Sequence, residues 1–100
     1  MADPVTLDLA SMHVTGDYFN AEKRDFVRSR FESCLLDRIS FWGANLGTTN
    51  FAYSTFYACD FSDADLSRCR NLELTELRYC HFNERTKWPE DFDPAWVMAA

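Results

Sequence analysis

The chain has 100 residues with a net charge of −6, and 47% of its residues are apolar and 16% aromatic. This length and composition suit one small folded domain with a modest core. The acidic balance argues against direct nucleic acid binding, because phosphates are bound by basic side chains. No stretch approaches the length of a membrane span and the first residues lack the pattern of a secretory signal, so we expect a cytoplasmic protein without membrane contact.

The N-terminal segment, residues 1–23, is the least regular part. Leu9, Val14 and Phe19 lie five residues apart. The positions two residues before them hold poor candidates for a tight interior, namely Leu7, Met12 and Asp17. The segment is therefore either a first, irregular coil or a strand and loop that cap the next one. We expect residues 22–23 to be an insertion that protrudes before the register is reset.

Residues 24–83 repeat with a period of five. Large apolar side chains occupy one position of the repeat: Phe26, Phe31, Leu36, Phe41, Leu46, Phe51, Phe56, Phe61, Leu66 and, after one extra residue, Leu72, Leu77 and Phe82. Two residues before most of them stands a small one: Ser29, Cys34, Ala44, Thr49, Ser54, Cys59, Ala64, Thr75 and Cys80, with Ile39 the bulky exception. This period fits neither an amphipathic helix nor a half-buried strand, and it indicates a repeat architecture with two inward positions per unit.

Several of these units resemble the pentapeptide repeat family. Residues 44–48 (Ala-Asn-Leu-Gly-Thr) and 64–68 (Ala-Asp-Leu-Ser-Arg) look like its consensus, and residues 59–63 are its Cys/Phe variant. Residues 86–94 resemble the tail with which many members close. The resemblance implies an all-β fold: a right-handed quadrilateral β-helix, or solenoid, with four pentapeptides per coil, three to four coils here, and a C-terminal cap.

In such a solenoid every twentieth residue stacks, so the resemblance predicts columns. Phe41, Phe61 and Phe82 are expected to form an aromatic ladder on one face. The extra residue is expected near Arg70 and Asn71, because the other register would point a charged arginine into the core. Glycine is scarce in this region, so we expect ordinary residues to form the corners in turn conformations that do not require glycine.

The C-terminal segment, residues 84–100, is expected to cap the stack. The repeat ends after Phe82, and a charged, proline-containing loop should fold back so that Trp88 and Phe92 cover the last coil. The final apolar residues are a second part of this cap or a contact with another chain. Members of the family dimerise through this end, which makes a homodimer one expectation. The residues concerned are Trp96, Val97 and Met98.

The sequence gives no support to an enzyme, a metal site or a cofactor. Four cysteines, Cys34, Cys59, Cys69 and Cys80, all fall on the small inward positions, and they match no paired zinc-binding spacing. We interpret them as reduced structural thiols; Cys59 and Cys80 stack one coil apart, but parallel side chains suit a disulfide poorly. The histidines, His13 and His81, stand on outward positions without an accompanying nucleophile motif.

The remaining candidate site is a set of outward aromatic residues. Trp42 follows Phe41, Tyr57 follows Phe56, and Tyr53 lies at a corner. Exposed tryptophan and tyrosine are common anchors of protein interfaces, although the same rings can simply lie against neighbouring side chains. We therefore interpret the chain as a non-catalytic protein-interaction or scaffold module whose partner is another protein.

An alternative is mimicry of DNA. Some pentapeptide repeat proteins protect DNA gyrase, a type II topoisomerase, from quinolones, and the family explanation is that an acidic rod imitates duplex DNA. Between residues 24 and 82, however, eight acidic side chains face seven arginines, so the rod itself is nearly neutral. A rod of this length, about 15–20 Å at strand spacing, is also short for that role.

Overall fold

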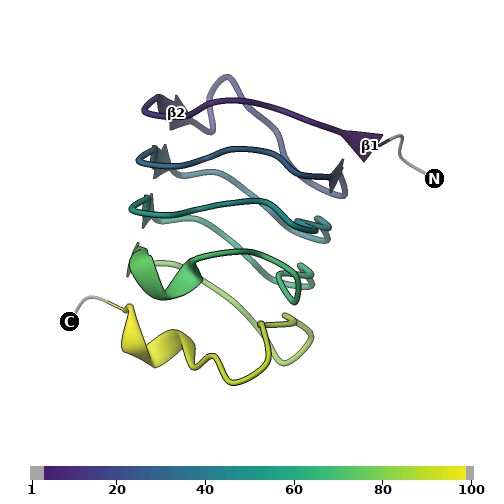
Figure 1. The fold of residues 1–100 in the computed structure, drawn as a ribbon, viewed down its shortest axis with the longest axis vertical. Helices are drawn as coiled ribbons and strands as arrows, with labels where there is room; N and C mark the ends of the chain where they lie inside the picture. The colour runs from purple at the N-terminus through teal and green to yellow at the C-terminus, as the bar shows by residue number, and fades with distance from the viewer. Residues whose placement is uncertain (1–3, 99–100) are drawn as a thin grey trace.

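The computed structural model describes residues 4–98, which form a stack of turns lying one below another (Figure 1). The elements are short: β1 (Pro4–Val5), β2 (His13–Thr15), β3 (Asp25–Phe26), β4 (Leu35–Asp37), β5 (Thr55–Tyr57), η1 (Leu72–Leu74), β6 (Glu76–Arg78) and η2 (Pro94–Trp96). All of the pairings between these strands are parallel. The predicted β-helix is confirmed at this level, since parallel strands follow one another from turn to turn.

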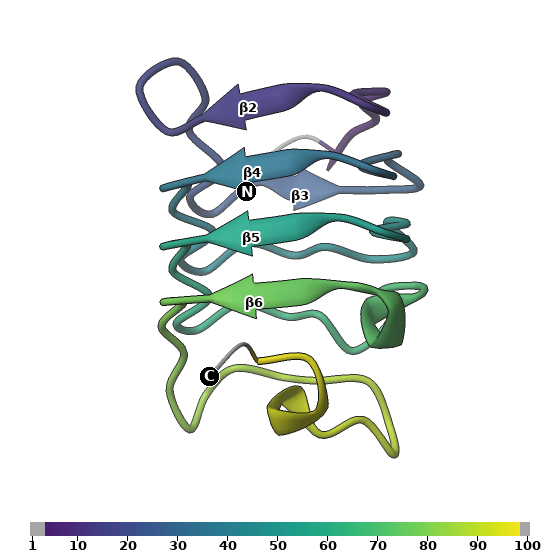
Figure 2. The same ribbon diagram turned by 90° about the vertical axis from the view of Figure 1, so that its left-hand side faces the viewer.

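The longest sheet has the order β2-β4-β5-β6 and forms one wall of the stack (Figure 2). Leu36 pairs with Phe56 and Phe56 with Leu77, so the step between turns lengthens by one residue after β5. The extra residue is Asn71: Arg70 still pairs with Asn50, and Asn71 follows with a φ of 65°. The predicted insertion point is therefore confirmed, and Arg70 is exposed.

Large side chains fill the interior of the stack as columns. Phe41 and Phe61 stack with ring centroids 5.2 Å apart and an interplanar angle of 7°. Phe56 meets Phe51 and Phe61 edge to face at 5.0 and 5.1 Å. Such offset and edge-to-face ring pairs add stabilisation beyond the buried area, so the columns support each other sideways as well as along the stack.

The small inward residues bond to the turn before them. The Cys59 Sγ–H donates to the carbonyl of Leu36 at 3.2 Å, and the Cys69 Sγ–H to that of Leu46 at 3.1 Å. The Thr86 hydroxyl donates to the carbonyl of Phe61 at 2.8 Å. A donor at the small position can thus satisfy a carbonyl next to the apolar columns, although Ala44 and Ala64 fill this position without one and the buried Thr49 hydroxyl has no partner among the described residues.

The predicted aromatic ladder is wrong at its last member. His81 pairs with Asp60, so Phe82 keeps the register, but its side chain is 37% exposed and its ring contacts Trp88 at 5.3 Å. The five-residue step ends after Phe82, because one additional residue precedes Lys87, but the backbone ladder continues beyond it, since Lys87 pairs with Asp65. Trp88 consequently enters the column below Leu66 and approaches Phe61.

The corners differ from the prediction. Most of them contain a residue in the left-handed region, with φ between 51° and 68°, two positions after the large side chain: Arg28, Ser33, Arg38, Gly43, Thr48, Tyr53, Ala58, Asp63 and Tyr79. Only Gly43 among these is a glycine. The sequence does not indicate this conformation, because residues other than glycine adopt it here. Each of them does so at a conformational cost of about 1–2 kcal/mol.

The first turn is irregular and its insertion lies elsewhere than predicted. Val14 pairs with Leu36, whereas Lys23 donates its N–H to the carbonyl of Trp42, so the extra residues lie between Gly16 and Ala21 rather than at residues 22–23. Figure 2 shows the resulting loop projecting beyond β2. Phe19 is displaced from the large inward position, which Ala21 takes.

Candidate functional site

The interior leaves the outer surface as the place for recognition. The twelve largest fully buried side chains fill the core. The phenylalanine rings of the central turns contact one another there. Within residues 4–98 no group of three or more His, Cys, Asp or Glu side chains is arranged to hold a metal ion. No helix in the same part of the chain has the length and apolarity needed to cross a membrane.

Trp42 lies on the outer surface beside the core column of Phe41. Its side chain is 36% exposed, and the ammonium group of Lys23 lies 4.8 Å from the ring centroid. A cation at this distance from an indole face is attracted by the ring's electron-rich surface. One face of Trp42 is therefore already occupied by a side chain of the preceding turn.

The two predicted tyrosines are more open than Trp42. Tyr53 is 70% exposed at a left-handed corner, and Tyr57 is 41% exposed at the end of β5. Tyr57 meets Tyr79 edge to face, with centroids 5.6 Å apart. Among the described residues, no ring contact joins Trp42, Tyr53 and Tyr57 to one another, so these three rings do not pack together as one cluster.

The C-terminal aromatic residues form a chain of contacts under the stack. Trp88 contacts Phe92 at 5.7 Å, and Phe92 contacts Trp96 at 6.0 Å. Trp88, Phe92 and Val97 pack against the core, whereas Trp96 is 66% and Met98 45% exposed. Met98 also pairs with Leu77 through the backbone. These residues thus divide into an inner set against the core and an outer pair.

The cysteines are free thiols on the inward positions. The hydrogen bond with Cys80 and burial raise the pKa of the Cys59 thiol, and burial raises the pKa of Cys69. A thiol whose pKa is raised stays protonated and is a weak nucleophile. The histidines stand outside, as expected: His81 is exposed, and His13 Nε2 lies 3.6 Å from Asp37.

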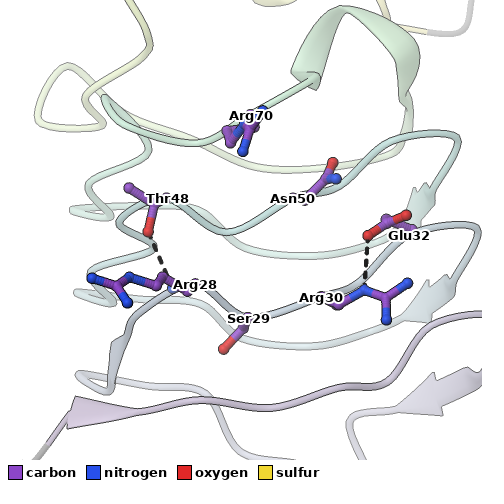
Figure 3. A pocket seen from close by; sticks show the side chains of 7 residues that line it. All are labelled: Arg28, Ser29, Arg30, Glu32, Thr48, Asn50 and Arg70. Atoms are coloured by element: carbon purple, nitrogen blue, oxygen red, sulfur yellow. Dashed lines mark hydrogen bonds and ion pairs between the residues drawn. The ribbon is translucent and has the colours of Figure 1, made fainter.

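Sequence reasoning missed a basic depression on one corner of the stack, which we call the arginine hollow. It measures about 480 Å³, and Figure 3 shows the side chains that line it: Arg28, Ser29, Arg30, Glu32, Thr48, Asn50 and Arg70. A neighbouring depression shares Arg28 and Thr48 and adds Arg68. The Arg68 guanidinium lies against Gly47, since a β-carbon built there would be 3.1 Å from Nη2.

The arginines of this corner are unequally engaged. Arg30 pairs with Glu32 at 3.0 Å and Asp8 at 3.2 Å, and these contacts, the Glu32 hydrogen bond first, raise its pKa. Arg28, Arg68 and Arg70 make no ion pair with any described residue. The corner therefore concentrates positive charge on a chain whose net charge is −6.

The signal for this cluster is present in the sequence. Arg28, Thr48 and Arg68 are twenty residues apart, as are Arg30, Asn50 and Arg70. A count of charges along the chain does not show this alignment, because the aligned residues are separated by twenty residues. At a spacing of twenty residues, the outward positions place Arg28 and Arg30 on one turn and Arg68 and Arg70 two turns later. The turn between them carries polar residues at the same positions.

Comparison with known proteins agrees with this architecture. The family model described as pentapeptide repeats matches residues 29–68 in eight copies. This part of the chain therefore matches pentapeptide repeats.

One similar solved structure is the crystal structure of a pentapeptide repeat protein, Rfr23, from the cyanobacterium Cyanothece 51142. The two are 21% identical, with a TM-score of 0.47, over 81% of this chain and 63% of that one. The chain thus spans less than two thirds of the length of that protein. No curated protein matches the sequence.

Proposed function

We propose that this chain is a non-catalytic protein-interaction or scaffold module. The observation that carries the proposal is the division between a filled interior and an exterior that presents aromatic side chains. Phe31, Phe41 and Phe56 are fully buried, whereas Tyr53 and Tyr57, only one or two residues from a core side chain, project outward. The backbone ladder fixes such outward side chains at the spacing of paired strands, about 4.8 Å, which provides a stiff surface for a protein partner.

A capture experiment with surface variants tests this function. The tagged chain is used to capture partners from a cell extract, alongside a Trp42→Ala/Tyr57→Ala double variant and a Tyr18→Ala control. Tyr18 is 95% exposed on the loop after β2, so its removal changes an aromatic surface residue elsewhere. We expect a specific captured protein to be lost with the double variant and retained with the control. Equal capture by all three chains contradicts a role for these aromatics.

The alternative function, mimicry of DNA toward a type II topoisomerase, has less support. Arg28, Arg68 and Arg70 gather on one corner, where an imitation of duplex DNA needs continuous negative charge. A gyrase supercoiling assay distinguishes the two functions. Protection of supercoiling from a quinolone by excess protein favours mimicry, and unchanged gyrase activity removes it.

We further propose that the two ends close a right-handed, four-sided stack of three to four coils. Residues 1–23 form the N-terminal coil or cap and residues 84–100 the C-terminal cap; positions 1–3 and 99–100 lie outside the described residues. The packing of Trp88 and Phe92 against the core supports the C-terminal assignment. Free thiols suit a reducing, cytoplasmic setting.

A homodimer through the C-terminal end is a separate proposal. Trp96 and Met98 offer exposed apolar area beside Val97, which packs against the core. Analytical ultracentrifugation should then give a dimer that a Trp96→Ala change weakens. A monomer at high micromolar concentration removes this proposal and leaves the interaction function intact.

A further inference from the structure

We propose that the arginine hollow binds an acidic peptide segment of a partner protein through carboxylates spaced along an extended chain. The inference rests on the proposed interaction function and specifies the chemistry of the partner. It is carried by the position of four arginines, Arg28, Arg30, Arg68 and Arg70, around a polar turn.

The spacing of the arginines matches an extended acidic segment. Arg30 and Arg70 lie two turns apart on either side of Asn50, which corresponds to about 10 Å at the usual distance between paired strands. In an extended peptide of the polyproline II type, which has three residues per turn, residues three positions apart point to the same side and are separated by about 9 Å. One carboxylate at the upper arginines and a second at the lower ones therefore fit a peptide that runs across the turns. Arginine suits this role, because its planar guanidinium can bind a carboxylate through two hydrogen bonds.

The middle turn supplies donors to the same segment. The Thr48 Oγ1 accepts the N–H of Arg28 at 3.1 Å, and the described residues offer no acceptor for its hydroxyl proton. The Asn50 Oδ1 accepts from Ala52 and Asn71, which fixes the amide, while its own NH₂ group has no acceptor among the described residues. Both groups line the hollow (Figure 3). A peptide lying there finds donors between the two charged sites.

The charge around the hollow favours a short acidic segment over a nucleic acid. Glu32 and Asp8 flank Arg30, and Asp65 lies near Arg68. A long polyanion that continues past the hollow meets these carboxylates and the net charge of −6. A segment with a few carboxylates contacts only the arginines and avoids this repulsion.

A peptide-binding measurement tests the proposal. The probe is a fluorescein-labelled, ten-residue peptide with glutamates at every third position, and fluorescence anisotropy is recorded at low salt. An Arg28→Gln/Arg70→Gln variant should bind about tenfold more weakly, since two exposed charge contacts are lost. The matched control is Arg24→Gln/Arg78→Gln, which removes the same charge away from the hollow and should bind nearly as the parent does. Circular dichroism melts of each variant verify folding.

A charge reversal provides an independent readout. Arg28→Glu/Arg70→Glu should lose the glutamate peptide and gain binding to the same peptide with lysine in place of glutamate. Equal binding of the glutamate peptide by the parent and the Arg28→Gln/Arg70→Gln variant overturns the proposal. Tighter binding of a single-stranded DNA of equal charge also overturns it and assigns the hollow to phosphates.

The outcome separates the ligand from the general function. If the peptide does not bind but the protein still captures a partner through Trp42 and Tyr57, only the acidic-segment proposal fails. If the peptide binds while partner capture does not depend on Trp42 and Tyr57, the interaction function is assigned to the arginine hollow instead of the aromatic residues.

Discussion

The central repeats and the two ends of the stack both place a large apolar residue at every fifth position, but they bury these side chains to different extents. From Phe26 to Leu66 every large side chain on the inward position of the repeat is at most 1% exposed, and each turn takes twenty residues. Insertions interrupt the step at both ends, and there Val14 is 9% and Phe82 37% exposed. Large side chains of the uninterrupted repeats lie between two neighbouring turns, whereas those near an end have a complete neighbouring turn on one side only.

The ends are covered by aromatic side chains that do not follow the repeat. Phe19 reaches Phe26 and Phe31 from the loop above, with centroid distances of 6.2 and 6.4 Å. Trp88 covers the other end of the stack, where its ring contacts Phe61. A repeat protein needs such covers because its terminal units have only one neighbour each.

The largest expected contrast is between a central and a terminal phenylalanine. Phe56→Ala should lower the free energy of unfolding by about 3–5 kcal/mol, because it opens a cavity among Phe41, Phe51 and Phe61. Phe82→Ala should cost about 1 kcal/mol, since the ring is partly solvated. Urea unfolding followed by circular dichroism measures both. Equal losses contradict a difference between body and end.

A second contrast compares two glycines that approach neighbouring turns. A β-carbon on Gly16 would lie 2.0 Å from the carbonyl oxygen of Arg38, whereas one on Gly47 would meet only the flexible end of Arg68 at 3.1 Å. Gly16→Ala should therefore cost about 2–3 kcal/mol and detach the first turn, and Gly47→Ala less than about 1 kcal/mol. Urea unfolding measures the free energy of unfolding of both variants. A Gly16→Ala variant as stable as the parent contradicts the close approach of the two turns at Gly16.

Much of this fold follows from the spacing of large and small residues. The period determines which side chains enter the core, and the cost of burying Arg70 places the extra residue correctly. The left-handed corners could not be predicted, because residues such as Tyr53 and Ala58 carry no signal for a positive φ. The return of Trp88 to a column was missed because one additional residue interrupts the period after Phe82.

The candidate site was predicted less well. Exposure of Tyr53 and Tyr57 follows from their outward positions, but their separation depends on the path of the backbone around each corner. The arginine hollow needs the pairing of Arg28 with Thr48 and Arg68, which a linear count of charge conceals. Outward columns therefore indicate which surface side chains gather together, which inward columns do not.

Corner strain offers a smaller test of the comparison. Ala58 has a φ of 53° in the body, and Asp91 has a φ of 62° in the C-terminal segment. Ala58→Gly should raise stability by about 0.5–1 kcal/mol, because glycine relieves the left-handed strain by more than its added unfolded-state entropy costs. Asp91→Gly should change the free energy of global unfolding less, since the C-terminal segment contributes less to that free energy. Thermal melts of the two variants provide the check, and a destabilised Ala58→Gly chain contradicts the strain.

The smallest effect concerns acid stability at the joint between the body and the C-terminal segment. Burial alone raises the pKa of Asp65, but hydrogen bonds from Ser67 and the charges of Lys87 and Arg68 outweigh it, so the pKa is lowered. Because the folded-state pKa is below the unfolded value of about 3.9, Asp65 stabilises the fold above that pH and loses this contribution as the pH falls. Asp65→Asn should make stability slightly less dependent on pH between about 5 and 3. Identical pH profiles for the two chains contradict this role.

Amide hydrogen exchange tests the central claim most directly, because it measures the stability of each turn separately. The claim is that the uninterrupted repeats form a rigid body and the ends are attached to it less firmly. The N–H groups of Phe31 and Phe41, bonded to carbonyls at 2.9 and 2.7 Å, should exchange only through global unfolding. Those of Ser11 and Gly16 in the first turn should exchange at a lower free energy. Uniform protection throughout the stack, or faster exchange in its centre than at its ends, contradicts the account.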